Sequence, residues 1–417
     1  MEENRSKPIA DELLIDDETP AASLTGGRAR TLLLLLGLVL VGLNLRPALS
    51  SLAPVLSMVS RDVGLSPALA GLLTTLPVAC LGIFGPLAPR LARRLGSEKT
   101  IAVVLLALAA GILLRTQLGQ FGLFAGSALA GAAIGVIGVL LPGIVKRDFA
   151  SRAGLMTGVY TMALCLGAAL AAGLTVPTAE AFGHDWRPAL ALWALPAVLA
   201  LAVWWPQLAT RHAAAQGRWR VEGLLRDPLA WQVTLFMGLQ SSLAYIVFGW
   251  LPSILMDRGL TPMQGGLMLS LSTMVQVPAS LLVPMLAHRC RDQRPPIAAT
   301  LLMVIAGLLG MLYAPTDGLI IWAALLGFGQ GGLFSTALSL LAHRSADQHV
   351  AASLSGMAQG IGYMLASMGP FAVGLIRGHS HAAWPLAILF CLIAATAFCI
   401  GMLAGRKRLV GVQAQPV

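Results

Sequence analysis

Residues 62–72 read DVGLSPALAGL and residues 257–267 read DRGLTPMQGGL, so one pattern occurs twice in the chain. The two copies are 257 − 62 = 195 residues apart. At the same spacing PRLARR at 89–94 is followed by PMLAHR at 284–289, and MTG at 156–158 has a weaker echo in LSG at 354–356, at a spacing of 198. Several matches in register across one apolar run and both of its flanks predict two related halves that run in the same direction through the fold.

The composition places these halves in a membrane. Of the 417 residues, 57% are hydrophobic and only 11% are charged, and the mean hydropathy is +0.79. A soluble fold could not cover that much apolar surface, whereas a helix that crosses a bilayer needs about 20 apolar residues. The sequence therefore predicts an all-α membrane protein with twelve transmembrane helices in two six-helix halves, from apolar runs at about 31–58, 67–89, 100–116, 121–145, 153–177, 186–206, 229–256, 263–287, 296–314, 318–342, 350–376 and 383–404.

Basic residues alternate between the two sides of the predicted bundle. With the N-terminus in the cytoplasm, the inner segments hold 22 Lys and Arg and the outer segments hold 5, a bias typical of a plasma-membrane protein with both termini inside. The net charge of +10 is therefore a topology signal, and we expect no nucleic-acid partner. The predicted division is a disordered cytoplasmic tail at 1–30, an N-terminal half at 31–206, a cytoplasmic linker at 207–228, a C-terminal half at 229–404 and a cytoplasmic tail at 405–417.

Arg46 is the one charged residue that the pattern places deep inside a span. It lies about 15 residues, or roughly 22 Å of helix, from the start of its run, which is farther than an arginine side chain reaches. A charge at that depth costs ~3 kcal/mol or more, so it is a functional candidate. Its fork of donors is suited to an anion, a carboxylate or a nitro group. The alternative is an arginine that holds the bundle by pairing with backbone groups. Asn44 and Ser50 lie nearby, and Pro47 frees the carbonyl of Leu43.

Further polar side chains lie at mid-span depth in the C-terminal half. Ser241 with Tyr245, and Gln359 with Tyr363, are each four residues apart and so share one helix face. For any single residue, a hydrogen bond between helices is the simpler explanation. Together they predict a substrate-lined cavity between the halves. The predicted substrate-binding set is Arg46, Asn44, Ser50, Gln240, Tyr245, Gln330, Gln359 and Tyr363, while Gln276 and Tyr160 are polar positions outside it.

Acidic and histidine side chains are absent from the middle of the predicted spans. All 18 Asp and Glu and all 7 His fall in the tail, in loops or at helix ends. A proton-coupled carrier usually has such a group inside the bundle, so facilitated transport or exchange is favoured. Asp62 and Asp148, near helix ends, keep a proton-coupled efflux carrier of the same fold as an alternative. A membrane enzyme would need a catalytic constellation or metal cluster in the bundle. We expect no enzyme, catalytic residue, metal or cofactor, and a non-transporting sensor is the remaining alternative.

Six motifs occur together along the chain: NLRP at 44–47, LLTTLP at 72–77, LPGIVKRDF at 141–149, AWQVTLF at 230–236, GWLP at 249–252 and SGMAQGIGY at 355–363. In combination they resemble the cyanate permease and 2-nitroimidazole exporter branch of the major facilitator superfamily. The likeness covers 31–405, and the stretch at 227–255 is closer to the exporters. The resemblance implies the major facilitator fold, alternating access and a location in a bacterial inner membrane. It also implies small planar nitrogen compounds or small anions as substrates.

One loop departs from the superfamily pattern. The loop between the second and third helices usually reads Gly-x-Leu-Ala-Asp-Arg-x-Gly-Arg-Lys, whereas residues 89–98 read PRLARRLGSE, with Arg93 at the acidic position. The gating ion pair that this loop supplies in the superfamily is thus altered, and Asp148 is a candidate partner for Arg93 or Arg94 across the cytoplasmic face. We expect a monomeric secondary transporter whose partners are a small-molecule or anion substrate and the lipid bilayer. The expected site is asymmetric, because Arg46 corresponds to Ser241 in the second half.

Overall fold

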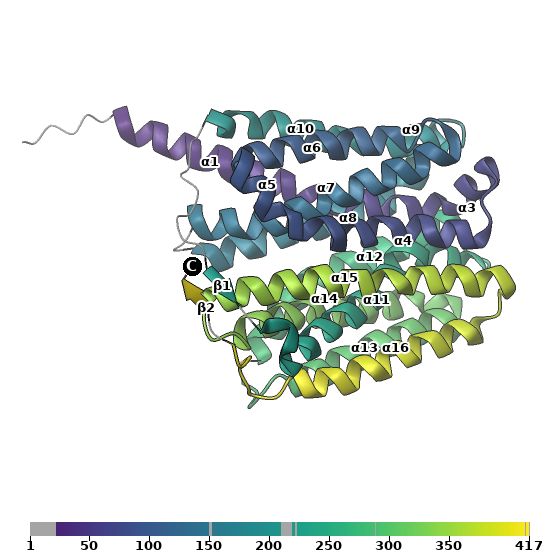
Figure 1. Ribbon diagram of the computed structural model, residues 1–417. Helices are drawn as coiled ribbons and strands as arrows, with labels where there is room; N and C mark the ends of the chain where they lie inside the picture. Colours follow the sequence, from purple (N-terminus) through teal and green to yellow (C-terminus); the bar gives the residue numbers. More distant parts are fainter. Residues whose placement is uncertain are drawn as a thin grey trace, which may run out of the picture.

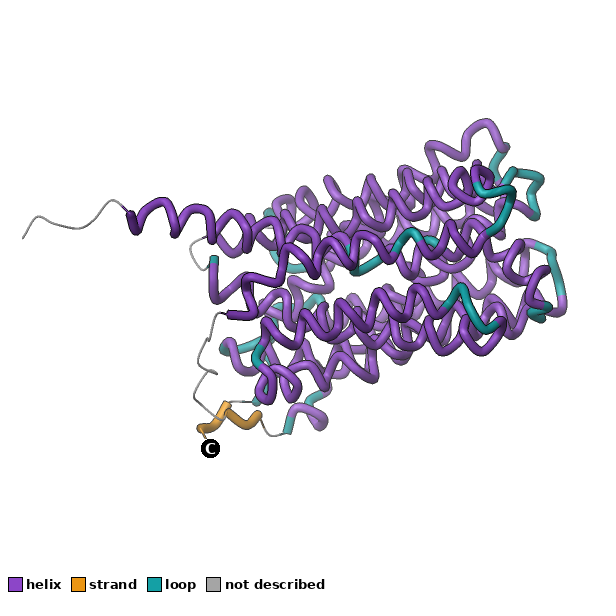
Figure 2. The backbone as a smooth tube through the Cα atoms, turned by 90° about the horizontal axis from the view of Figure 1, so that it is seen from above, coloured by secondary structure: helices purple, strands orange, loops and turns teal. Residues whose placement is uncertain are grey.

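The computed structural model of the protein describes residues 22–149, 152–209, 219–221, 223–287, 289–412 and 414–416. Within these residues, twelve helices are long and apolar enough to cross a membrane, which confirms the predicted all-α fold. The two halves lie side by side with their long helices roughly parallel (Figure 1). Two short strands near the C-terminus are an addition that the sequence pattern did not indicate (Figure 2).

Three spans of the N-terminal half are assembled from consecutive shorter helices. The first span consists of α1–α3, the second runs from α4 into the short basic helix α5, and the sixth consists of α9 and α10. In chain order the elements are α1 (Ala22–Leu43), α2 (Pro47–Ser50), α3 (Leu52–Val63), α4 (Pro67–Phe84), η1 (Gly85–Leu87), α5 (Ala88–Leu95), α6 (Ser97–Leu114), α7 (Gly119–Asp148), α8 (Ala153–Ala181), α9 (Trp186–Ala191), α10 (Ala194–Trp204) and η3 (Trp205–Ala209).

The spans of the C-terminal half are long helices, one for each crossing. They are α11 (Pro228–Met256), α12 (Pro262–Ala287), α13 (Arg294–Tyr313), α14 (Leu319–His343), α15 (Gln348–His379) and α16 (Ala383–Ala404), with η4 (Leu224–Arg226) before α11 and η5 (Thr316–Gly318) before α14.

Both copies of the repeated motif end one helix and begin the next. Gly64 and Gly259 have φ angles of +69° and +90°, a conformation that glycine adopts without steric cost. Two residues later the side chain of Ser66 accepts a hydrogen bond from the first turn of α4. In the second copy Thr261 and Gln264 cap each other reciprocally at the start of α12. In each case a proline then opens the helix, so the repeat encodes the same turn twice.

The two halves meet along two helix pairs, α4 with α15 and α8 with α12. Gly374 of α15 approaches α4 so closely that a Cβ there would lie 2.5 Å from the Cα of Gly71. Helix α3 adds contacts with α11 and α12 at the end of the bundle opposite the C-terminus (Figure 1). There, apolar side chains of both halves form one continuous cluster that includes Leu56, Val59 and Leu255. The halves are therefore in tight contact at this end.

The linker between the halves is joined to the C-terminal tail. Strand β1 (Trp219–Val221) pairs antiparallel with β2 (Ala414–Pro416). The carboxylate of Asp227 accepts hydrogen bonds from the backbone N–H groups of Leu229 and Gly411, and so connects the start of α11 to the tail.

Some predicted boundaries shift in the structure. Helix α1 begins at Ala22, so 22–30 is helical rather than part of a disordered tail, and 1–21 lie outside the described residues. In the predicted linker at 207–228, residues 210–218 and 222 also lie outside them.

Candidate functional site

The first span is broken at the depth of Arg46. Helix α1 ends at Leu43 and α2 begins at Pro47, which has no N–H to continue the ladder. The intervening backbone tightens, with the N–H of Asn44 donating to the carbonyl oxygen of Val41 at 3.1 Å. Gly167 of α8 packs on the Leu43 carbonyl, since a Cβ there would lie only 2.0 Å from that oxygen. A discontinuous helix near the bilayer midplane is a common construction for solute sites in carriers.

Arg46 projects from this break toward the C-terminal half. Its Nη1 donates a hydrogen bond to Oε1 of Gln276 on α12 at 3.2 Å. Its guanidinium carbon lies 4.9 Å from the ring centre of Phe248 and 5.8 Å from that of Phe334. The aromatic rings stabilise the cation, but none of these contacts neutralises its charge. Arg46 therefore remains a full positive charge between the two halves.

A chain of amides continues from Arg46 into the C-terminal half. Gln276 Nε2 donates to Oε1 of Gln330 on α14 at 3.2 Å. Both glutamines are buried, and Gln330 Nε2 has no hydrogen-bond partner among the described residues. Gly327 and Gly331 bring α14 into backbone contact with α12 here, because a Cβ on either would lie within 2.4 Å of an α12 carbonyl oxygen. The two amides are thus held on closely packed backbones.

Two tyrosines lie near the same arginine, and a third lies near one of them. The rings of Tyr245 and Tyr363 meet edge to face, with centroids 6.0 Å apart. Both lie within electrostatic reach of Arg46, and Tyr160 lies within reach of Tyr363. A planar solute beside Arg46 would thus contact aromatic walls from α11, α14 and α15.

The structure gathers only some of the predicted substrate-binding residues at Arg46. Tyr245, Gln330 and Tyr363 belong to the cluster described above. Gln276 and Tyr160 were outside the predicted set, but Gln276 contacts Arg46 and Tyr160 lies near Tyr363. Phe248 and Phe334 had no polar signal that could have found them. Gln276 could have been included, because it occupies the same depth in its span as Gln330.

The remaining predicted residues make local or structural contacts. Asn44 donates to the carbonyl oxygens of Leu40 and Pro196, which joins α1 to α10. Ser50 donates to the carbonyl oxygen of Ala168 on α8. Gln240 donates to Ser241 beside it, and Gln359 donates to Ser355 on its own helix. Asn44 and Ser50 are buried in packing contacts of the N-terminal half rather than facing a solute.

A second arginine, Arg115, is buried close to the break in the first span. Arg115, expected on the outer side, is 1% exposed, and its Nη1 donates to the carbonyl oxygen of Ala48 at 2.6 Å. Arg115 directly follows the last residue of α6, and its guanidinium lies beside the broken first span. Arg115 fits the structural alternative of an arginine held by backbone carbonyls, whereas Arg46 does not.

The predicted gating residues pair differently from the expectation. Arg147 at the end of α7 contacts Glu98 at 2.6 Å and Asp148 at 2.7 Å. Among the described residues, Asp148 forms no ion pair with Arg93 or Arg94. Glu98, at the first turn of α6, is buried and takes the position of the last basic residue in the superfamily loop. The acidic residue of this loop is thus at position 98 instead of 93, and its ion pair with Arg147 lies within the N-terminal half.

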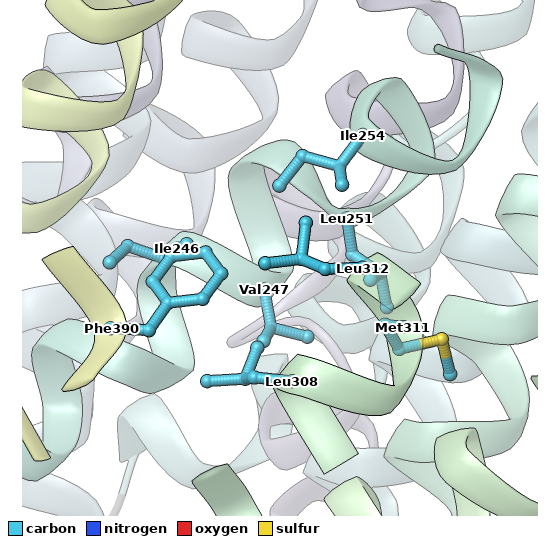
Figure 3. A pocket seen from close by; sticks show the side chains of 8 residues that line it. All are labelled: Ile246, Val247, Leu251, Ile254, Leu308, Met311, Leu312 and Phe390. Atoms are coloured by element: carbon cyan, nitrogen blue, oxygen red, sulfur yellow. The ribbon is translucent and has the colours of Figure 1, made fainter. Parts of the chain in front are cut away.

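Two small cavities lie between helices of the described residues. One, with about 10 Å³ open to the centre of a water molecule, touches Tyr245 and Phe248 beside the cluster around Arg46. The other is walled entirely by hydrocarbon and thioether side chains of α11, α13 and α16, including Met311 and Phe390 (Figure 3). Each has room for roughly one water molecule. Within the described residues, no group of three or more His, Cys, Asp or Glu is placed to hold a metal ion.

Comparison with known proteins assigns the family. A family model described as the Major Facilitator Superfamily matches residues 32–370. The chain is 36% identical over 394 residues to the 2-nitroimidazole transporter of Escherichia coli (strain K12), covering 94% of this chain and 99% of that protein. It is 34% identical over 352 residues to the cyanate transport protein CynX of the same strain, covering 83% of this chain and 90% of that protein.

A solved structure agrees at the level of the fold. The bacterial homolog of the human lysosomal transporter Spinster, in an inward-facing and occupied conformation, superposes with a TM-score of 0.70 at 13% identity. The match covers 93% of this chain and 97% of that one. Family, relatives and fold agree that the chain is a multi-pass membrane transporter and not an enzyme. The chain belongs to the Major Facilitator Superfamily, and its sequence is similar to the 2-nitroimidazole and cyanate transporters within it.

Proposed function

We propose that the protein moves a small planar nitrogen compound or a small anion, of the 2-nitroimidazole or cyanate kind, across a bacterial inner membrane by alternating access. The observation that carries this proposal is Arg46, a half-buried guanidinium between the two halves that is held by an amide oxygen and two aromatic rings. A cation at this depth is energetically costly, so its presence indicates a functional role.

The chemistry around Arg46 favours a planar ligand with an anionic or nitro group. A guanidinium binds two oxygens of one group through parallel hydrogen bonds. The rings of Phe248, Tyr245 and Tyr363 offer apolar faces and edges to a flat ring. The names of the two curated relatives, a 2-nitroimidazole transporter and a cyanate transport protein, lie within this class.

The position of the site supports alternating access. Arg46 belongs to the N-terminal half, whereas its amide and aromatic partners belong to the C-terminal half. The halves are in tight contact at the end formed by α3, α11 and α12. A rocking motion that separates them there would open the site toward that end of the bundle. We place both termini in the cytoplasm.

The test is solute flux in proteoliposomes that contain the purified protein, with 2-nitroimidazole, cyanate and nitrate offered with and without a pH gradient. Arg46→Ala and Arg46→Lys should lower saturable flux at least about tenfold, because each loses a charge-assisted bidentate contact worth ~1.5–3 kcal/mol. Arg61→Ala is the matched control, since Arg61 is an exposed arginine in the last turn of α3. Normal flux by the Arg46→Ala protein would show that the site is wrong. Flux that only a pH gradient drives would favour the proton-coupled carrier.

A further inference from the structure

The hydrogen bonds from Arg46 through two glutamines run in one direction. An arginine side chain has donors but no acceptor, so Oε1 of Gln276 must face Arg46, at 3.2 Å. The Nε2 group of Gln276 is therefore the one that faces Gln330, where it donates to Oε1 at 3.2 Å. This forces the Nε2 group of Gln330 to the end of the chain, where it is buried without a partner among the described residues.

The unpaired amide at the end of this chain is unfavourable in the resting arrangement. A buried donor without an acceptor loses its interaction with water and gains nothing in return. Gln330 is 5% exposed and Gln276 is 6% exposed, and close glycine contacts hold their helices together. The backbone therefore cannot easily move to satisfy the donor. The amide groups, in contrast, can turn about their terminal side-chain bond, which is a soft torsion.

We propose that Gln276 is a substrate-binding residue whose amide reverses when the solute binds. The proposal rests on the function proposed above, in which Arg46 binds the oxygen-bearing group of the solute. Once an oxygen of the solute replaces Oε1 of Gln276 at Arg46, the amide of Gln276 is free to turn. Its Nε2 then donates to the solute, and its Oε1 accepts from Nε2 of Gln330, which turns in the same way. The reversed chain pairs the Nε2 groups of both glutamines and leaves the Oε1 atom of Gln330 at its buried end.

The reversal defines what the solute must offer. Arg46 donates from the N-terminal half and Gln276 donates from the C-terminal half, so the solute needs two acceptor atoms, one for each donor. A nitro group meets this requirement, and so does a carboxylate, whereas an unsubstituted imidazole does not. The bound solute then replaces the direct bond between Arg46 and Gln276 as the polar link between the halves. Gln276 thereby determines specificity and also couples binding to the contact between halves.

The test compares Gln276→Leu with wild type by equilibrium binding of 2-nitroimidazole, nitrate and imidazole to the purified full-length protein. Gln276→Leu should weaken 2-nitroimidazole and nitrate binding about tenfold or more, as expected for the loss of a hydrogen bond to a strongly polar group. Imidazole binding should change less than twofold. Thr273→Val is the matched control on α12, because the Thr273 hydroxyl is buried and, among the described residues, bonds only to the Leu269 carbonyl of its own helix. It should bind both oxygen-bearing probes as the wild type does.

A second variant removes the amide donor and also adds a carboxylate that pairs with Arg46, so it should weaken binding of oxygen-bearing solutes on both counts. Gln276→Glu keeps the size of the side chain and its acceptor for Arg46, but an ionised carboxylate has no donor for the solute. This protein should retain wild-type thermal stability and lose 2-nitroimidazole binding at least as severely as Gln276→Leu. If either Gln276 variant bound 2-nitroimidazole within twofold of the wild type, this proposal alone would be overturned. Absence of saturable binding of 2-nitroimidazole and nitrate to the wild type would instead overturn the proposed substrate class, and this proposal with it.

Discussion

A guanidinium whose partners are amide oxygens and aromatic rings keeps its charge available, because no carboxylate neutralises it. Arg46 has this character, and its partners come from the half to which it does not belong. Arg115 is enclosed more completely but donates to the backbone of its own half. We therefore propose different roles for the two arginines. The charge of Arg115 is used in holding the broken first span, while the charge of Arg46 faces the space between the halves.

Phe248 lets the aromatic contribution be measured at the scale of one residue. Phe248→Leu removes the ring at 4.9 Å from the Arg46 guanidinium, a contact worth about 0.5–2 kcal/mol. We expect binding of 2-nitroimidazole to weaken roughly 2- to 30-fold, and binding of cyanate to weaken less because cyanate has no ring to pack against Phe248. Equilibrium binding of both probes checks this. Phe390→Leu is the control, since Phe390 lines the separate apolar cavity (Figure 3). An equal loss for both probes would contradict an aromatic contact.

At the scale of elements, glycine contacts determine how closely the halves approach. Helices in a bilayer gain little from burying apolar surface against each other, so close backbone packing at small residues stabilises their contact. Gly71 and Gly374 provide such a contact between α4 and α15, and Gly266 contacts the backbone of α8 at Ala172. These positions lie on the two helix pairs along which the halves meet, so we expect substitutions there to change the rocking motion proposed above.

Two glycines one turn apart on α15 give a matched test of this contact. A Cβ at Gly374 would lie 2.5 Å from the Cα of Gly71, whereas at Gly378 the nearest atom is 3.7 Å away, an ordinary contact. Both alanine substitutions gain about 1 kcal/mol of helix propensity, but overpacking at Gly374 costs about 1–3 kcal/mol. Gly374→Ala should therefore lower the melting temperature of the purified protein and its transport rate. Gly378→Ala should match or exceed wild-type stability, and equal behaviour of the two would argue against this contact.

At the scale of the whole molecule, the distribution of charge predicts the orientation in the membrane. The basic helix α5 and the basic end of α7 lie toward the termini, whereas the turn between α8 and α9 lies at the opposite end (Figure 1). A reporter protein fused after Gly405 should be cytoplasmic, and one inserted after Gly183 should be outside, because basic loops remain in the cytoplasm. Enzymatic reporters that are active on only one side of the membrane measure this. Cytoplasmic activity of the Gly183 fusion would reverse the proposed topology.

Much of this architecture could be predicted from the chain alone. The twelve spans follow from apolar runs, since only a helix satisfies every backbone group in lipid. The repeat at Gly64 and Gly259 specified equivalent turns, because the conformation and the caps are local properties of those residues. The depth of Arg46 was also predictable, because it depends only on its distance from the ends of its span. These features could be predicted because each depends on interactions between residues that are close together in the chain.

What the sequence by itself determined is thus the twelve-helix, two-half scaffold and the placement of a charge within it. Only the tertiary structure decided which polar residues meet that charge. Gln276 and Phe248 are 230 and 202 residues along the chain from Arg46 (276 − 46 and 248 − 46), and nothing local indicates that their side chains meet it. The contact of Arg115 with the Ala48 carbonyl oxygen and that of Asn44 with α10 likewise depend on tertiary packing. Helix periodicity specifies the face on which a side chain lies, but the neighbour at that face depends on how the helices pack.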